Sequence, residues 1–241
     1  MTDRYREHAP TFDPHGLYAQ VWVREIGVPR VVRVVPDGCM DVIWHRESGH
    51  LFVAGPDSLA HVAPIDPGTL VGVRFSPGSA PAALGVPADS LRDGRVPLDG
   101  IWPGAEVRRL ADALKGAADA RPVLQHAITA HADRARDGVA TAVLRLLDAG
   151  RQVGSIAETV GLSERQLHRR CLAAFGYGPK VLHRILRFDR ARRLAGSGVP
   201  FADVAHTLGY ADQAHLSRDV KALAGVTLSE LVPRQEAEVT R

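Results

Sequence analysis

The chain has 241 residues, 45% of them hydrophobic, which is typical of two globular domains of roughly 100 to 150 residues each. The formal net charge is only +3, yet residues 151 to 221 hold twelve Lys or Arg against six Asp or Glu, so positive charge suited to a polyanion gathers near the C-terminus. Two cysteines, Cys39 and Cys171, are too few for a disulfide framework or a four-cysteine zinc site. The start lacks an apolar signal region and no apolar run reaches the roughly 20 residues that span a bilayer, so we expect a cytoplasmic protein without membrane contact.

Residues 17 to 75 are rich in valine and favour short strands. The runs VWVREI, RVVRVV, MDVIW, HLFVA and TLVGVRF are separated by PDG, GPD and DPG turns. Short β-branched runs between turn signals predict an antiparallel sheet or small barrel. In the PDG turn, Asp37 and Gly38 suit a tight reversal, and we expect Asp41 to brace it.

From residue 79 onward the sequence favours helices. Alanine and leucine recur at helical spacing in residues 79–84, 88–92, 105–117 and 121–135. We expect these helices to connect two domains, with the boundary at the RARDG segment. The predicted fold class is α+β, with a β-rich sensor or dimerisation domain over residues 1–137 and an all-α domain over residues 138–241.

The segment SIAETVGLSERQLHRRCLAAF has the pattern of a helix-turn-helix unit. Ser155 with Glu158, and Ser163 with Gln166, each form the S-x-x-E/Q pattern that satisfies free amides at a helix start. Gly161 lies between them and supplies the turn. The segment therefore predicts a short helix, a tight turn and a second helix that begins at Ser163.

The same pattern recurs, which strengthens the prediction. Equivalent residues recur 48 positions apart before the turn and 49 after it: Ile156, Ala157 and Gly161 match Val204, Ala205 and Gly209, and Leu167, Arg169 and Gly176 match Leu216, Arg218 and Gly225. An internal repeat of this kind predicts two recognition helices presented together. Between the copies, Pro179 begins a long helix that reaches about Leu194.

The apolar positions of each recognition helix identify its outer face. Leu167, Cys171 and Ala174 in the first, and Leu216, Val220 and Leu223 in the second, are expected to face the core. The residues predicted to contact DNA bases are Arg165, His168, Arg169, Gln213, Ser217 and Arg218, because such side chains pair with base edges in the major groove. The residues predicted to contact phosphates are Ser163, Arg170, Lys180, Arg184, Arg187, His215 and Lys221.

These motifs, in this order, resemble the DNA-binding domain of the AraC/XylS family over about residues 139–234. The resemblance rests on IAETVGLSERQLHRRCLAAFGYGP, ARRLAGSG and VAHTLGYADQAHLSRDVKALAGVTLSEL. It implies a seven-helix domain whose two recognition helices enter successive major grooves. Val220 stands where the family commonly has an aromatic residue, so looser packing is expected there.

The segments VVRVVPDGCMDVIW, VGVRFSPGSAPAALGV and RVPLDGIWPGAEVRRLADAL resemble the poorly characterised N-terminal domain of some AraC-type regulators. By analogy this domain is a cupin-like barrel that senses a small molecule or dimerises. The candidate ligand-binding residues are Trp22, Trp44, Phe52, Arg74 and Phe75. No cofactor is indicated, and no metal site is expected because His45, His50 and His61 lack the H-x-H pattern of metal-binding cupins.

The sequence as a whole predicts a non-enzymatic, sequence-specific DNA-binding transcription regulator that is modulated by a small molecule or by oligomerisation. Its predicted partners are double-stranded DNA, a small-molecule effector, a second copy of the chain and, for an activator, RNA polymerase. Two alternatives stay open: a cysteine-based alkylation-repair sensor and a cupin-type enzyme tethered to DNA. A cysteine between apolar strands, such as Cys39, is ordinarily a small buried hydrophobe, although a sensor thiol or metal ligand is the other interpretation.

Overall fold

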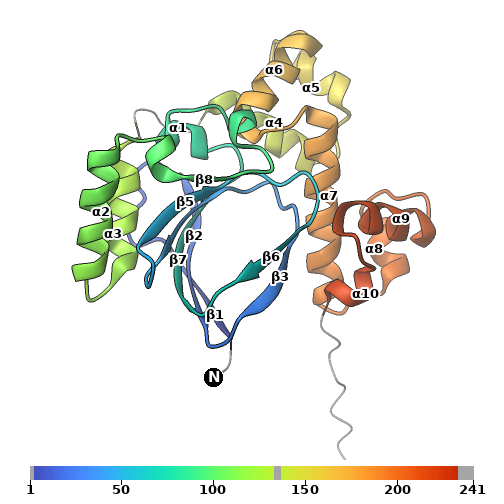
Figure 1. The fold of residues 1–241 in the computed structure, drawn as a ribbon. Helices are drawn as coiled ribbons and strands as arrows, with labels where there is room; N and C mark the ends of the chain where they lie inside the picture. The colour runs from blue at the N-terminus through green and yellow to red at the C-terminus, as the bar shows by residue number, and fades with distance from the viewer. Residues whose placement is uncertain (1–2, 133–136, 233–241) are drawn as a thin grey trace, which may run out of the picture.

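A computed structural model describes residues 3–132 and 137–232 (Figure 1). The N-terminal part is a β domain with short helices, and the C-terminal part is helical, which confirms the predicted α+β class. The strands of the β domain are β1 (Arg4–His8), β2 (Tyr18–Ile26), β3 (Arg30–Val34), β4 (Asp41–His45), β5 (His50–Ala54), β6 (His61–Ile65), β7 (Gly68–Phe75) and β8 (Arg95–Pro97).

The strands form two sheets and do not close into a barrel. Six strands pair in the order β1-β2-β7-β4-β5-β8, and β3 pairs with β6 in a separate two-stranded sheet. All of these pairings are antiparallel. We call the two-stranded sheet the β3–β6 ribbon. The expected barrel is therefore an open, roughly cupin-like arrangement in which the ribbon faces the large sheet.

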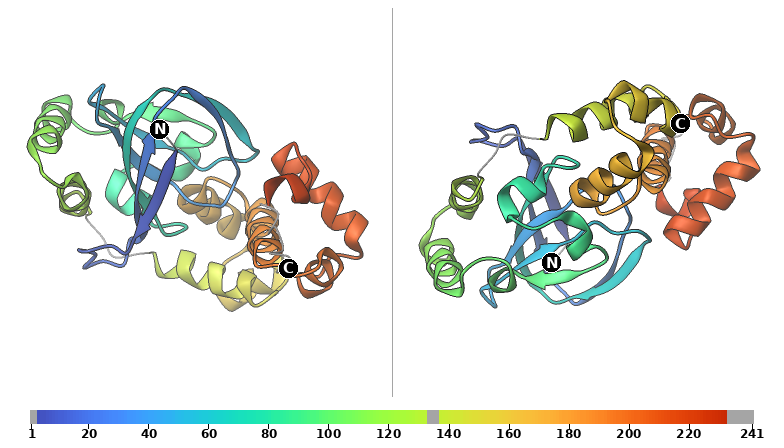
Figure 2. Two further views of the ribbon diagram at one scale, coloured as in Figure 1. Left: turned by 90° about the horizontal axis from the view of Figure 1, so that it is seen from below. Right: turned by 90° about the horizontal axis from the view of Figure 1, so that it is seen from above.

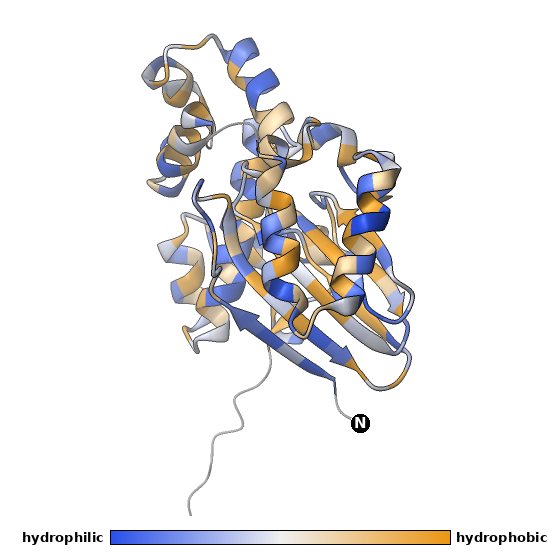
Figure 3. Cartoon of the chain, turned by 90° about the vertical axis from the view of Figure 1, so that its left-hand side faces the viewer, coloured by the Kyte–Doolittle hydropathy of each residue, from blue (hydrophilic) through white to orange (hydrophobic). Residues whose placement is uncertain are grey.

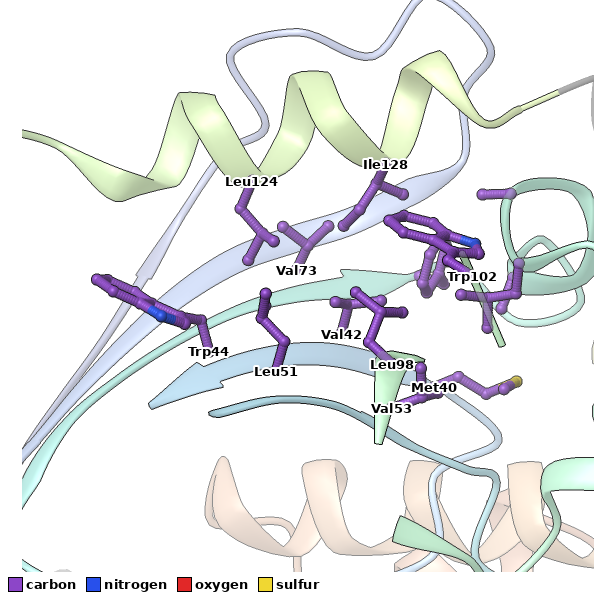
Figure 4. Packing of buried hydrophobic residues seen from close by; sticks show 14 of the residues in the cluster. Met40, Val42, Trp44, Leu51, Val53, Val73, Leu98, Trp102, Leu124 and Ile128 are labelled. Atoms are coloured by element: carbon purple, nitrogen blue, oxygen red, sulfur yellow. The ribbon is translucent and has the colours of Figure 1, made fainter. Parts of the chain in front are cut away.

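Strand alternation gives the large sheet two apolar faces. On β4, Val42 and Trp44 are fully buried in the main core of the domain, whereas Ile43 belongs to a smaller cluster on the opposite face. Figure 4 shows Trp44, Val42 and Val73 below Leu124 and Ile128, which project from the helix above them. The second face is turned toward the β3–β6 ribbon.

Helices cover the main core of the β domain. These are α1 (Ala80–Leu84), the 3₁₀ helices η1 (Ala88–Leu91) and η2 (Leu98–Gly100), α2 (Gly104–Gly116) and α3 (Ala120–Ala130). Each stretch predicted to be helical in residues 79–130 is present within one or two residues; the predicted continuation of the last one through residues 133–135 lies outside the described residues. Figure 3 shows hydrophobic residues along the strands beneath these helices and a hydrophilic β1 at the edge.

The C-terminal part holds seven helices within residues 137–232: α4 (Gly138–Asp148), α5 (Val153–Thr159), α6 (Glu164–Phe175), α7 (Pro179–Gly196), α8 (Phe201–Thr207), α9 (Gln213–Ala224) and α10 (Leu228–Leu231). They share one core, to which every helix contributes buried residues. Pro179 opens α7, as predicted. The two helix pairs α5–α6 and α8–α9 lie toward different ends of α7 (Figure 1).

One predicted helix cap is wrong. Helix α5 begins at Val153 with Gln152 as its cap residue, so Ser155 lies inside the helix, and its hydroxyl donates to the Gln152 carbonyl oxygen at 2.9 Å. The S-x-x-E pattern of Ser155 and Glu158 therefore does not form a capping box, because the helix starts three residues earlier than a cap at Ser155 requires. The second box is present: Ser163 and Gln166 satisfy each other's backbone amides at the start of α6.

The β domain contacts the helical domain at the C-terminal end of α6. The Tyr177 hydroxyl donates to the Asp57 carbonyl oxygen at 2.7 Å, and Tyr177 itself is only 1% exposed. A Cβ atom added to Gly78 would lie 2.5 Å from the Phe175 ring, so the backbone approaches the aromatic side chain as closely as only glycine allows. Figure 2 shows the two domains side by side along α7. In the described ranges, no helix is both long and apolar enough to cross a membrane.

Candidate nucleic-acid interface and ligand pocket

The first helix-turn-helix unit consists of α5, a turn and α6. Gly161 provides the turn with a φ of 70°, a conformation that glycine adopts without strain. Leu167, Cys171 and Ala174 of α6 are buried, as their spacing predicted. Because these residues fix the helix against the core, the opposite side of α6 is turned to solvent.

The predicted base-contacting residues of α6 share that solvent face. Arg165, His168 and Arg169 are all exposed near the N-terminal half of the helix. The ring of His168 lies over Gly178, where an added Cβ would be 2.6 Å from Nε2. Two arginines and one histidine thus stand together on an exposed helix surface, which is the arrangement that major-groove readout requires.

The second unit consists of α8, a turn at Gly209 and α9. The Asp212 carboxylate accepts a hydrogen bond of 2.6 Å from the His215 amide and so caps α9. Leu216, Val220 and Leu223 are buried as predicted, and Val220 is fully buried in place of the expected aromatic residue. Gln213, Ser217 and Arg218, the predicted base-contacting residues, are all exposed.

His215 braces the turn of the second unit. Its Nδ1 atom lies 3.3 Å from the Ala211 amide nitrogen, and its ring meets the Tyr210 ring edge-on with centroids 5.2 Å apart. The imidazole is therefore already occupied by contacts within the domain. Its predicted phosphate contact would have to be made by the remaining Nε2 atom.

A buried ionic cluster joins α7 to the second unit, and sequence reasoning missed it. Asp219 of α9, with 8% of its side chain exposed, lies 2.5 Å from Arg184 Nε and 3.5 Å from Arg187 Nη2. The Tyr210 hydroxyl donates to Asp219 at 3.0 Å, and the Arg187 guanidinium stacks 3.9 Å from the Tyr210 ring centroid. Burial raises the pKa of Tyr210 to about 12, which keeps its hydroxyl protonated as a donor.

This cluster changes how Arg184 and Arg187 are understood. Both were predicted to contact phosphates, but both guanidinium groups are engaged by Asp219. Their spacing of three residues along α7 places them on one side of the helix, toward α9. The arginines thus hold the second unit on α7, and a phosphate contact through their remaining N–H groups stays a prediction.

The other predicted phosphate contacts lie at the surface. Lys180 at the start of α7 and Lys221 in the last turn of α9 are exposed. Arg170 is exposed as well, and its guanidinium pairs with Asp137 at 3.1 Å. Ser163 is engaged as the cap of α6. Their roles at DNA stay predictions.

The β domain contains a pocket of about 530 Å³ between the large sheet and the β3–β6 ribbon, a size suited to a small molecule. Its apolar walls come from both sheets and include Trp22, Ile43, Phe52, Leu70, Val32, Val34, Ala63 and Ile65. Tyr5 contributes from β1, and His45, His50 and His61 also line the pocket. The pocket is thus mostly apolar, with a few polar groups that are able to orient an occupant.

An ion pair forms the polar end of the pocket. Asp41, 7% exposed, accepts hydrogen bonds from Trp22 Nε1 at 2.7 Å and from Arg74 Nε at 3.1 Å. Arg74 also lies 3.3 Å from Asp37 in the PDG turn. Asp41 therefore braces that turn only through Arg74, while Asp37 itself accepts a hydrogen bond from the Cys39 amide at 2.8 Å.

Three of the five predicted ligand-binding residues line the pocket: Trp22, Phe52 and Arg74. Trp44 and Phe75 do not, since they are 0% and 1% exposed and belong to the main core on the other face of the sheet. The reason is strand alternation, which turns Trp44 away from its neighbours Ile43 and His45, and Phe75 away from Arg74. We correct the predicted site accordingly.

Cys39 is partly buried beside this ion pair. Burial and the neighbouring Asp37 carboxylate raise the pKa of its thiol well above the ordinary range. The thiol is therefore protonated at neutral pH, which is the form least suited to nucleophilic chemistry. Within residues 3–132 and 137–232, no group of three or more His, Cys, Asp or Glu side chains is arranged to hold a metal ion.

Comparison with known families assigns both halves of the chain. Residues 156–234 match a helix-turn-helix domain, and residues 7–97 match a domain of unknown function, DUF6597. No curated protein matches the chain at a significant level.

Several solved structures are similar. A transcriptional regulator with an AraC-type DNA-binding domain from Chromobacterium violaceum is 26% identical, over 38% of this chain and 86% of that one, with a TM-score of 0.36. ToxT from Vibrio cholerae is 12% identical, over 97% of this chain and 99% of that one, with a TM-score of 0.45. The structure of ToxT bound to an unsaturated fatty acid is 11% identical, over 84% and 93% of the two chains, with a TM-score of 0.42.

The matched helix-turn-helix domain contains two units of the same construction, α5–α6 and α8–α9, linked by α7, each with an exposed polar recognition surface. It follows a β domain of the DUF6597 type. The chain thus combines an N-terminal DUF6597 domain with a C-terminal DNA-binding helix-turn-helix domain of the AraC type.

Proposed function

We propose that this regulator reads a specific DNA sequence through the exposed faces of α6 and α9, and that a small molecule in the pocket of the β domain controls its binding. The observation that carries the first part is the paired arrangement of two capped helices with exposed Arg, His, Gln and Ser side chains. Arginine suits guanine and glutamine suits adenine in the major groove. Residues 1–137 act as the sensor domain and residues 138–241 as the DNA-binding domain.

Selection of bound sequences from random DNA with the full-length chain tests this part. We expect enrichment of two sequence boxes about one helical turn, or about 10 base pairs, apart, one for each recognition helix. Recovery of DNA without a shared sequence, with binding that only weakens as salt rises, would contradict sequence-specific recognition.

The pocket supports the second part of the proposal. Most of its wall is apolar, and its three arginines are occupied: Arg74 pairs with Asp41 and Asp37, Arg95 with Asp57 at 2.7 Å, and Arg24 with Asp3 at 2.7 Å. Because these guanidinium groups are already neutralised, the pocket favours an uncharged, largely apolar molecule over an anion. Formation of a homodimer stays a prediction. Contact with RNA polymerase is predicted only for an activator.

Trp22 supplies the means to test ligand binding. It lines the pocket, whereas Trp44 and Trp102 are buried in the main core. We expect cyclohexanol, which does not fluoresce, to change the tryptophan fluorescence more than cyclohexanecarboxylate, its charged relative. The change should vanish in Trp22→Phe. Stronger binding of the carboxylate would overturn the preference for uncharged ligands.

A further inference from the structure

The β3–β6 ribbon has two faces with different neighbours. Val32 and Val34 of β3 line the pocket, and Arg33, which lies between them, points to the opposite side. On β6, Ala63 pairs with Val32 across the ribbon and lines the pocket too. Strand β3 therefore contacts the pocket through one face and leaves its other face free to contact a neighbouring element.

Behind the ribbon lies the C-terminal end of the second recognition helix. Arg33 Nη1 donates to the Ala224 carbonyl oxygen at 2.9 Å, and the Ala60 amide donates to the Leu223 carbonyl oxygen at 2.7 Å. The last carbonyl groups of a helix lack partners within the helix, so donors from outside are what they need. Arg33 of the ribbon and Ala60, which directly precedes β6, supply two such donors to α9.

The first recognition helix is attached differently. Its C-terminal end contacts the loops and short helices that cover the main core, through Phe175 against Gly78 and through Gly176 against Pro56. The ribbon, by contrast, forms no ladder with the six strands of the large sheet in the described part of the chain. Two strands on their own are marginally stable, so the ribbon is the more easily displaced of the two attachments.

We propose that the β3–β6 ribbon transmits occupancy of the pocket to the second helix-turn-helix unit while the first unit stays in place. This inference rests on the proposed control by a small molecule. An apolar occupant that contacts the large sheet and Val32, Val34 and Ala63 draws the ribbon inward, away from the Leu223 and Ala224 carbonyl groups. Occupancy shifts the position of α9 only to the extent that the occupant binds the inward arrangement more tightly.

A side chain attached inside the pocket replaces the unidentified ligand in the test. Ala63→Cys is folded first and then labelled with benzyl methanethiosulfonate, which leaves a thiobenzyl group on the pocket side of the ribbon. The matched control is Val28→Cys, labelled in the same way in the loop before β3, where Val28 is 59% exposed and does not line the pocket. Labelling of the wild-type chain measures any reaction of Cys39 and Cys171.

Hydrogen exchange of the Ala60 amide is the main readout, since this amide bonds directly to α9. We expect exchange to rise about tenfold on labelling of Ala63→Cys, the factor that matches the loss of one hydrogen bond, and to stay unchanged on labelling of Val28→Cys. Amides in α6 should keep their protection. Complete labelling at residue 63 without a change at Ala60, or equal changes in both variants, would overturn the proposal.

A second variant tests the same contact without any label. Arg33→Gln removes the guanidinium from Ala224 and leaves the pocket lining intact, because Arg33 is not part of it. Exchange at Ala60 should already be faster in this variant, and labelling at residue 63 should then add little. If labelling at residue 63 raised exchange at Ala60 by the same factor in Arg33→Gln as in the unsubstituted background, the label and Arg33 would act independently, which would contradict transmission through the ribbon. Both readouts are independent of DNA, so a failed DNA selection would count against the proposed function and not against the ribbon.

Discussion

Asp219 is a single buried carboxylate that holds two arginines and a tyrosine between α7 and α9. Removing its charge leaves Arg187 stacked on Tyr210 without a counter-charge. We expect Asp219→Asn to lower the free energy of unfolding by about 2 kcal/mol, less than the full cost of a broken buried pair because the arginines are partly solvated. Urea denaturation measures this change in the free energy of unfolding, and Asp203→Asn on the exposed face of α8 is the control. Equal stability of the two variants would show the cluster to be dispensable.

Arg169 is predicted to contact a base and Lys221 a phosphate, so substitutions of the two should affect DNA binding differently. If Arg169 pairs with a guanine, Arg169→Ala should cost about 1 to 3 kcal/mol of discrimination at one base position. Lys221→Ala should weaken binding to all sequences alike and lower the salt slope by about 0.9. Titration of the selected site and of single-base variants at several salt concentrations measures both. A uniform loss in Arg169→Ala would assign that arginine to a phosphate.

Cys39 offers a prediction that depends on pH. Because burial and Asp37 raise the pKa of the thiol, its reactive thiolate is scarce at pH 8 and forms only as the pH rises well above that value. We expect iodoacetamide to alkylate Cys39 in the folded chain at least about ten times more slowly than in the chain unfolded in guanidinium. Mass spectrometry of the modified peptide measures the two rates. Comparable rates would reopen a role as a sensor thiol.

Individual residues show where sequence reasoning succeeds. The inward positions of both recognition helices and the cap at Ser163 depend on local spacing, and they were predicted correctly. Trp44 and Phe75 were misplaced because both faces of the large sheet are apolar, so alternation alone does not reveal which face carries the pocket. The partners of Asp219 were missed because they come from α7 and from the turn before α9, which local spacing within α9 does not reveal.

At the scale of elements, two glycines at helix-turn-helix positions have different surroundings. Gly161 has a positive φ and open space around its Cα, whereas an added Cβ on Gly176 would lie 2.5 Å from Pro56. Gly161→Ala should therefore cost about 1 kcal/mol from backbone strain alone, and Gly176→Ala clearly more. Thermal unfolding of both variants gives the difference. Equal losses would mean that the contact between α6 and Pro56 adds nothing.

The sequence of β3 predicts that it is a strand but does not predict which strand it pairs with. The run RVVRVV predicted a strand, and the structure places β3 there. Nothing in that run indicates that the strand leaves the large sheet, because β3 and β6 pair across about thirty residues and their partner α9 lies far beyond in the chain. Such pairings are decided by packing of the whole molecule and not by local propensity.

At the scale of the whole molecule, the contact between the domains should couple their unfolding. The Tyr177 hydroxyl bonds to Asp57 across this contact in a fully buried position. We expect Tyr177→Phe to cost about 1 kcal/mol and to broaden a single calorimetric transition toward two. Tyr5→Phe, with its exposed ring on β1, is the control. An unchanged single transition would place the coupling elsewhere, for example at the ribbon.

The internal repeat made the helical domain easier to predict than the β domain. Two copies of one pattern reinforced each other and fixed the order α5–α6, α7, α8–α9. The β domain has no repeat, so its open arrangement and its pocket emerged only from the pairing of strands that are distant in sequence. The division into a β domain and a helical domain was therefore predictable, but the surface that joins them was not.

Three hydrogen bonds that tie the recognition helices to the β domain end on backbone oxygens. Arg92 reaches the Gly176 carbonyl, Arg33 reaches that of Ala224, and the Ala60 amide reaches that of Leu223. The side chains predicted to read bases lie at the other ends of the same helices and take no part in these bonds. Under the proposed function, substitutions at those positions change the operator and leave these hydrogen bonds intact, so the operator and the effector are free to change separately over evolution.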